Sequence, residues 1–169
     1  MNKIAIIGVT ASGKTTIANK IGKILDIPVH HLDKTFWAEK GGLKQDAFVE
    51  KVNEILKESK WIMDGSFPRS RTLEIRIENA DTIILYDLPL PLVLWRQTKR
   101  YFKYRNQVRP DMGGNNIQKY PFTWKEVKWA YNFPIKEIKS KITPLTGTKN
   151  IIIIKSPKDE IAFIKSISF

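Results

Sequence analysis

Five short apolar runs alternate along the chain with longer stretches in which apolar residues recur at helical spacing. Continuous apolar runs, often rich in β-branched residues, are typical of strands buried on both faces of a parallel sheet. The predicted strands lie within residues 4–7, 27–33, 61–64, 82–86 and 151–154. The predicted helices cover residues 16–25, 45–57, 72–79, a stretch starting near 91, 124–141 (which tolerates Pro134 or kinks there) and 159–167. This alternation predicts an α/β fold with a parallel sheet between two layers of helices.

A glycine-rich turn follows the first apolar run. Residues Gly8 to Thr15 read Gly-Val-Thr-Ala-Ser-Gly-Lys-Thr and match the pattern Gly-x4-Gly-Lys-Thr between a strand and a helix. In such a loop the backbone N–H groups face phosphate oxygens, Lys14 reaches the β- and γ-phosphates, and the Thr15 hydroxyl binds magnesium. A dinucleotide-binding Gly-x-Gly-x-x-Gly motif is excluded because residue 10 is threonine. The predicted nucleotide contacts in this loop are Gly8, Ala11, Ser12, Gly13, Lys14, Thr15 and Thr16.

The phosphate loop makes the expected fold more specific. We expect a three-layer P-loop NTPase fold with a five-stranded parallel sheet in the order 2-3-1-4-5 and a helical lid insertion. The 169 residues fit a single domain, and the lid is predicted as a basic segment at about 96–121. Residues 106–121 form a stretch too long for an ordinary connection, and loops of that length are usually functional lids or disordered segments.

Acidic residues close three of the predicted strands, namely Asp33, Asp64 and Asp87. Ligands of open α/β sheets gather at the carboxyl ends of the strands, where one carboxylate can support magnesium and a second can orient or deprotonate an acceptor. The alternative for each of them is a helix cap or a turn former. Asp64 is favoured for magnesium because Gly65 after it permits close approach, whereas Asp87 is favoured as structural.

The composition limits the classes of partner. Lys and Arg number 29 against 17 for Asp and Glu, so the net charge of +12 suits nucleic acid, an anionic membrane or a small polyanion such as ATP, or simply a solvated surface. No apolar run is long enough to span a membrane. The absence of cysteine excludes a disulfide and a cysteine-based zinc site and fits a cytoplasmic protein. The adjacent His30 and His31 point to opposite faces of a strand, which favours a core or surface role over a metal site.

A basic segment follows the fourth predicted strand. From Leu88 to Pro110 there is no acidic residue, and the cations are Arg96, Lys99, Arg100, Lys103, Arg105 and Arg109. Arginines on a lid that closes over the site neutralise the charge of a transferring phosphoryl group and exclude water. Two alternatives remain for this segment: an exposed helix face, or a nucleic-acid groove in which Tyr101, Phe102 and Tyr104 stack on bases.

Several motifs along nearly the whole chain carry a family resemblance. They are the phosphate loop, His31-Leu32-Asp33, Asp64-Gly65, Asp87-Leu88-Pro89, Leu94-Trp95-Arg96 and Arg109-Pro110-Asp111-Met112-Gly113. In this order they resemble the bacterial DNA topology modulation family, small P-loop proteins related to adenylate kinase. The resemblance implies a kinase-like fold and activity rather than that of a topoisomerase.

The resemblance to adenylate kinases also implies roles for single residues. Residues 64–69, Asp-Gly-Ser-Phe-Pro-Arg, are similar to an adenylate kinase motif with one residue inserted, which implies that Asp64 lies near magnesium and Arg69 holds the acceptor phosphate. Arg71 competes with Arg69 for that role. The resemblance places Arg96 near the base and Arg100 on the triphosphate. It also implies that Ser156 and Pro157, after the last strand, cradle adenine.

The leading hypothesis is an ATP- and magnesium-dependent phosphotransferase of the adenylate-kinase-like type. It transfers the γ-phosphate to a small acceptor, expected to be a nucleoside monophosphate, without a membrane partner. The predicted catalytic residues are Lys14, Asp33, Asp64 and Arg100; the predicted acceptor contacts are Asp33, Arg69, Arg71 and Arg109; the predicted magnesium ligands are Thr15 and Asp64. The alternatives are a nucleotide-gated nucleic-acid-binding regulator and an NTPase without a small-molecule acceptor.

Overall fold

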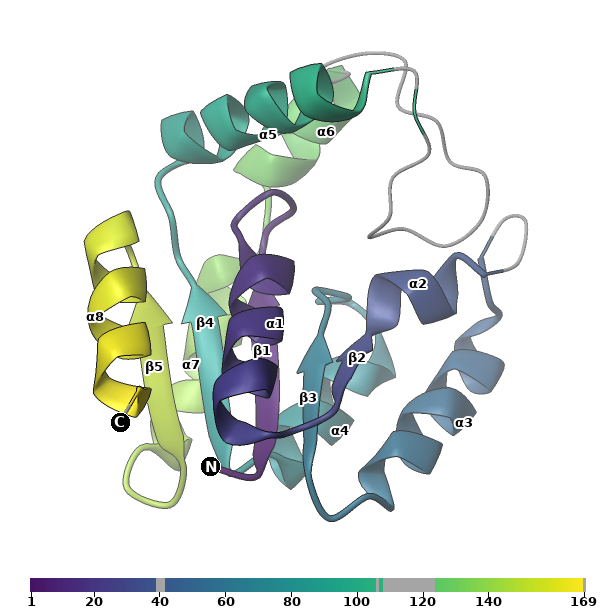
Figure 1. Ribbon diagram of the computed structural model, residues 1–169. Coiled ribbons are helices and arrows are strands. Elements are labelled where there is room, and N and C mark those ends of the chain that lie inside the picture. Colours follow the sequence, from purple (N-terminus) through teal and green to yellow (C-terminus); the bar gives the residue numbers. More distant parts are fainter. Residues whose placement is uncertain (39–41, 106, 108–123, 169) are drawn as a thin grey trace.

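Five parallel strands form one sheet in the computed structural model, which describes residues 1–38, 42–105, 107 and 124–168 (Figure 1). The strands are β1 (Lys3–Gly8), β2 (Val29–His31), β3 (Trp61–Asp64), β4 (Thr82–Tyr86) and β5 (Asn150–Ile154). Their order in the sheet is β2-β3-β1-β4-β5, and every neighbouring pair is parallel. The predicted fold class and strand order are thereby confirmed.

Helices cover both faces of the sheet (Figure 1). They are α1 (Lys14–Leu25), α2 (Leu32–Phe36), α3 (Gln45–Leu56), α4 (Arg71–Asn79), α5 (Leu90–Tyr104), α6 (Trp124–Tyr131), α7 (Ile135–Ile142) and α8 (Pro157–Ile167), with a 3-10 turn at Thr143–Leu145. No helix among the described residues is long and apolar enough to cross a membrane.

Alternation along the strands divides the core into two layers. Ala5 and Ile7 of β1 face a cluster with α3, α4 and α7, whereas Ile4 and Ile6 face a cluster with α1 and α8. All four of these β1 residues are fully buried, as expected for a strand that is covered on both sides. This arrangement is the three-layer architecture that the apolar pattern predicts, and it leaves the carboxyl edge of the sheet for polar side chains.

The helix predicted over residues 124–141 is two helices, which corrects that prediction. α6 ends at Tyr131 and α7 begins at Ile135, because Pro134 has no N–H to continue the hydrogen-bond ladder and its ring clashes with the preceding turn. Phe133 between them is 8% exposed and packs in the core beside α7. The backbone therefore leaves the helical conformation at residues 132–134, around the buried Phe133, where the sequence pattern predicts a continuous or kinked helix.

The second strand is shorter than predicted. It ends at His31, and the next five residues form α2, so Asp33 lies in the first turn of a helix rather than at a strand end. Its position beyond the carboxyl end of β2 nevertheless keeps it at the edge of the sheet where the phosphate loop lies.

Candidate active site

The phosphate loop connects β1 to α1 and has the backbone conformation that its glycines permit. Gly13 has a φ of 106° and Ala11 a φ of 58°, both in the left-handed region. A side chain on Gly8 would bring a Cβ to 2.6 Å from the Cβ of Tyr86 on the neighbouring strand β4. Glycine at this position therefore lets the loop leave the sheet at close packing distance. The N-terminus of α1 opens into the loop, and its unpaired N–H groups favour an anion there.

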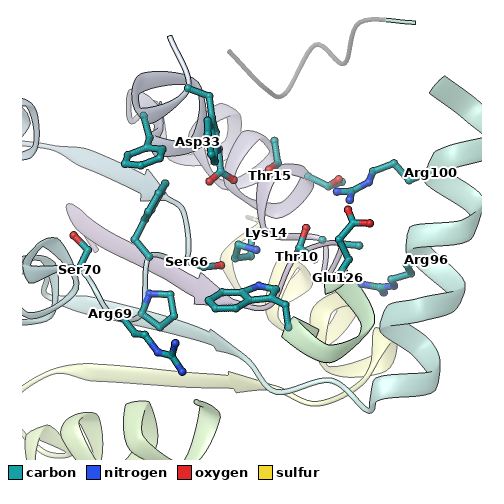
Figure 2. A pocket seen from close by; sticks show the side chains of 18 of the residues that line it. Thr10, Lys14, Thr15, Asp33, Ser66, Arg69, Ser70, Arg96, Arg100 and Glu126 are labelled. Carbon is teal, nitrogen blue, oxygen red and sulfur yellow. The ribbon is translucent and has the colours of Figure 1, made fainter. Parts of the chain in front are cut away.

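Lys14 lies in the middle of the site (Figure 2). Its side chain is nearly buried, and its Nζ donates a hydrogen bond of 2.8 Å to the carbonyl of Val9 in the same loop. Burial lowers the pKa of the Lys14 ammonium, while the carboxylates of Asp64 and Asp33 oppose that shift. The phosphate loop thus carries its own cation at the point where phosphate oxygens would sit.

Asp64 at the end of β3 is joined to the loop by the side chain of Thr15. The Thr15 hydroxyl donates to Asp64 Oδ2 at 2.7 Å, and His31 Nδ1 lies 3.2 Å from the same oxygen. Asp64 is 2% exposed, and its other oxygen, Oδ1, has no hydrogen-bond partner among the described residues. A buried carboxylate oxygen without a partner beside a hydroxyl fits a magnesium ion or its bound water. Thr15 and Asp64 are therefore the residues that could hold the ion.

Two arginines of α5 extend over the phosphate loop from the carboxyl edge of the sheet (Figure 2). The Arg96 guanidinium donates to the Ser12 carbonyl and lies 3.9 Å from a carboxylate oxygen of Glu160 on α8. Arg96 thus ties α5 to both the loop and α8. Arg100, one helical turn later, lines the same cleft, and Figure 2 shows the Glu126 side chain extending toward it.

A cleft of about 880 Å³ runs from the phosphate loop to the loop after β3. Its polar lining beyond the phosphate loop includes Asp33, Ser66, Arg69 and Ser70, on the side away from α5 (Figure 2). Its apolar lining includes a cluster of four aromatic rings with centroids 4.7–5.2 Å apart, namely Phe36, Trp37, Phe48 and Phe67. The cleft is therefore large enough for a second small molecule beside the one on the phosphate loop.

Most residues predicted for the site lie together in this cleft. The lining includes Ala11, Gly13, Lys14, Thr15, Thr16, Asp33, Arg69, Arg96 and Arg100. Gly8 and Ser12 lie in the loop behind it, and buried Asp64 contacts Thr15.

Three other predicted residues, Arg71, Ser156 and Pro157, do not line the cleft. Of the two arginines proposed for the acceptor, Arg69 lines the cleft, whereas Arg71 is exposed and pairs with Asp46 at 3.6 Å. Ser156 caps α8 through a 3.3 Å bond from the Asp159 N–H, and neither it nor Pro157 lines the cleft. Arg109 lies outside the described residues, so its role stays a prediction.

Asp87, at the end of β4, forms an ion pair with Lys139 of α7. That contact fits the structural role predicted for it and leaves the candidate magnesium position to Asp64.

Three site residues were not predicted from the sequence. His31 contacts Asp64, and Trp129 of α6 lines the cleft. Arg76 of α4 is fully buried and donates to the carbonyls of the loop after β3. Its spacing from Leu73 and Ile77 places it on the apolar face of its helix, which is the sequence signal for a buried cation.

Two solved structures of shikimate kinases are similar to this chain. The enzyme from Bacteroides thetaiotaomicron superimposes with a TM-score of 0.54 at 12% identity, over 97% of this chain and 94% of that chain. The enzyme from Aquifex aeolicus gives a TM-score of 0.55 at 17% identity, over 97% and 92%. No protein-family model and no curated protein sequence matches the chain. At these identities the similarity establishes the fold, and the resemblance to the topology modulation family stays a prediction.

Proposed function

We propose that this chain is an ATP- and magnesium-dependent phosphotransferase that acts on a small acceptor. The observation that carries the proposal is one cleft with two unlike halves. One half is lined by Lys14, Thr15 and the arginines of α5, and the other is lined by Asp33, Arg69 and an aromatic wall. A protein that only hydrolysed a nucleotide has no need of the second half. The shikimate kinase fold of the structural neighbours supports the same class of reaction.

The donor half binds the triphosphate mainly by electrostatics. The N–H groups of the phosphate loop and the Lys14 ammonium would meet the β- and γ-phosphates, and Arg100 would approach them from α5. Arg96 keeps α5 at the right distance because it contacts Ser12 and Glu160. A bound magnesium ion supplies charge neutralisation on the phosphates, and Thr15 and Asp64 are the residues that would hold it.

The acceptor half orients a hydroxyl or phosphate oxygen for attack. Asp33 can accept the proton or hold the hydroxyl, and Arg69 can pair with an anionic group elsewhere on the acceptor. The catalytic gain comes from alignment of the two substrates and from the cations around the transferred group. A nucleoside monophosphate fits this description, and so does a small hydroxy acid.

The test is a coupled ADP-release screen across nucleoside monophosphates, sugars and small hydroxy acids, with shikimate included because of the structural neighbours. We expect at least one acceptor to accelerate ADP release from MgATP, and Asp33→Asn to raise the KM of that acceptor. ATP hydrolysis that no compound accelerates would contradict the proposal and favour an NTPase.

The donor half is tested by removal of its cation. Lys14→Ala is expected to lower turnover of MgATP by about 100-fold or more, because it removes a donor aimed at developing phosphate charge. Lys20→Ala, an exposed lysine of the same helix, is the matched control and should keep wild-type turnover. Equal rates for wild type and Lys14→Ala would exclude this site as the place of reaction.

A second cavity favours one alternative function, nucleotide-gated nucleic-acid binding. It has a volume of about 580 Å³, lies between α1, α2 and α5, and is lined by five cations: Lys34, Arg96, Lys99, Arg100 and Lys103. Tyr104 lies beside them as a ring on which a base can stack. Tight oligonucleotide binding that falls steeply with salt, without phosphoryl transfer to any acceptor, would support this function over the kinase.

A further inference from the structure

Arg76 carries a buried charge that neither substrate half of the cleft uses. Its side chain lies on α4 with no solvent exposure, and its guanidinium donates to three carbonyls: Thr72 at 3.0 Å, Gly65 at 2.7 Å and Ser66 at 3.1 Å. It forms no ion pair with any described carboxylate. Burial lowers the pKa of Arg76 to about 10, while Asp64 and Asp33 oppose the shift. A guanidinium buried without a contacting carboxylate costs free energy that its hydrogen bonds must offset.

Two of the three carbonyls that Arg76 contacts, those of Gly65 and Ser66, belong to the segment that forms the acceptor-side wall. Ser66, Phe67, Pro68, Arg69 and Ser70 all line the cleft directly after those carbonyls. Phe67 has a φ of 38°, which is unfavourable for a bulky residue and persists only where the surroundings hold the backbone.

The same segment also contacts the phosphate loop. The Ser66 hydroxyl donates to the carbonyl of Gly8, so the wall is fixed to the donor half at one end. Gly65 has no room for a side chain, since a Cβ would lie 2.9 Å from the Cβ of Leu32. The wall is therefore held from two sides, by α4 through Arg76 and by the phosphate loop through Ser66.

We propose that Arg76 is a positioning residue, whose buried guanidinium fixes residues 65–70 so that the acceptor side of the cleft keeps its shape against the phosphate loop. The role in acceptor binding rests on the proposed function, whereas the role in holding the segment does not. Arginine is required because its planar fork supplies several N–H donors in fixed directions, which the compact ammonium of a lysine cannot reproduce.

Hydrogen exchange of the whole chain tests the proposal. In Arg76→Lys, which keeps the charge, the backbone amides of residues 65–67, 69 and 70 (Pro68 has no N–H) should exchange about tenfold faster than in wild type, with a larger effect in Arg76→Met. Ile77→Ala is the matched control: it removes a buried side chain of the same helix and should lower stability without a local effect on residues 65–70.

Two hydrogen-exchange results would overturn the proposal. One is wild-type exchange at residues 65–70 in Arg76→Lys, and the other is an increase spread evenly over the sheet as in Ile77→Ala. For an acceptor found in the screen, Arg76→Lys should raise its KM about tenfold and leave that of MgATP within about twofold; equal increases in both would also overturn it. The exchange measurement needs no acceptor, so its result is independent of whether the kinase proposal holds.

Discussion

At the scale of single residues, the carboxylate of Asp64 connects the phosphate loop to the candidate magnesium position. One of its oxygens accepts from Thr15 and lies close to His31, and the other is buried without a partner among the described residues. Such an oxygen has lost its hydration without a replacement, which is costly unless a ligand supplies one. We therefore expect binding of the nucleotide and its magnesium ion to depend strongly on the negative charge of Asp64.

The first prediction concerns magnesium. Asp64→Asn should raise the Mg²⁺ concentration needed for half-maximal ATP turnover about 10- to 100-fold, because an amide holds the ion or its waters less well than a carboxylate. A magnesium titration at saturating ATP measures it. Asp87→Asn is the control at the neighbouring strand end, since Asp87 is paired with Lys139, and it should leave the magnesium requirement unchanged.

Sequence motifs predict the residues whose spacing alone defines their role, and they predict less well the residues that depend on packing. Lys14 and Thr15 follow from the loop pattern, and Asp64 follows from its place after an apolar run. Arg76 was not predicted, since its three carbonyl partners include two that lie ten and eleven residues earlier in the chain. Arg69 lines the cleft and Arg71 does not, because their side chains lie on different sides of a turn, which the sequence pattern does not show.

At the scale of elements, α1 packs unusually close to the chain that leads into β2. Gly22 allows this approach, because a Cβ there would lie 2.5 Å from Val29 Cγ2 and 2.9 Å from the Ile27 carbonyl. The backbone N–H of Ile27 donates to the Gly22 carbonyl across the same contact. The tight turn between helix and strand thus depends on the absence of a side chain.

The second prediction is that Gly22→Ala destabilises the protein. Helix propensity alone favours alanine by about 0.5–1 kcal/mol, but the clash with β2 should outweigh it and lower the free energy of unfolding by about 1–3 kcal/mol. Urea unfolding followed by circular dichroism measures the change. Lys23→Ala in the same turn should stay within about 0.5 kcal/mol of wild type, and a more stable Gly22→Ala protein would contradict the close packing.

The third prediction uses Asp81, which joins the starts of β1 and β4. Its carboxylate accepts from the backbone N–H groups of Asn2 and Lys3 and from the Thr82 hydroxyl. Burial alone would raise the pKa of Asp81, but these hydrogen bonds outweigh it and lower the pKa below its usual range. The stabilisation is therefore fully present above the unfolded-state pKa of about 4 and is lost as the pH falls through the folded-state value.

Asp81→Asn should accordingly cost about 0.5–1 kcal/mol at pH 7, a figure discounted for the partial exposure of the site. The difference from wild type should shrink as the pH falls below about 4. Urea unfolding at pH 7, 5 and 3 measures it, and a difference that grows toward acid pH would contradict the assigned direction of the shift.

The periodicity of apolar residues was sufficient for the sheet and for the main helices, because the central strands β1, β3 and β4 are buried on both faces. It was insufficient where one or two residues determine where a helix begins or ends. Periodicity continues through Phe133 and Pro134, although the backbone breaks there, since Phe133 is as apolar as a helix residue would be. Asp33 belongs to a five-residue helix, which is too short to show a period.

At the scale of the whole molecule, the site connects elements from across the sequence. The phosphate loop, the loop after β3 and α5 meet at one edge of the sheet, and Arg96 links that edge to α8. A ligand bound there contacts segments that come together only in the folded state. Nucleotide binding should therefore stabilise the whole fold.

The fourth prediction is a thermal shift. Saturation with MgATP at about 100 times its Kd adds about 2.7 kcal/mol to the free energy of unfolding, which for a chain of this size raises Tm by about 5–10 °C. Differential scanning calorimetry or a dye-based melt measures it. Lys14→Ala should abolish the shift, and an equal shift in that variant would place the nucleotide elsewhere.

The central place of β1 also has a consequence for the order in which the protein folds during synthesis. β1 is made before both of its partners, since Lys3 pairs with Trp61 and Ile4 with Thr82. At translation rates of 5–20 residues per second, roughly 4–16 s separate the synthesis of β1 from that of β4. During most of that interval, until β3 has been made, the apolar strand and its phosphate loop have no neighbouring strand to pair with. We therefore expect the nascent β1 to be shielded by chaperones or by transient collapse, and nucleotide to stabilise the fold only after β4 has emerged from the ribosome.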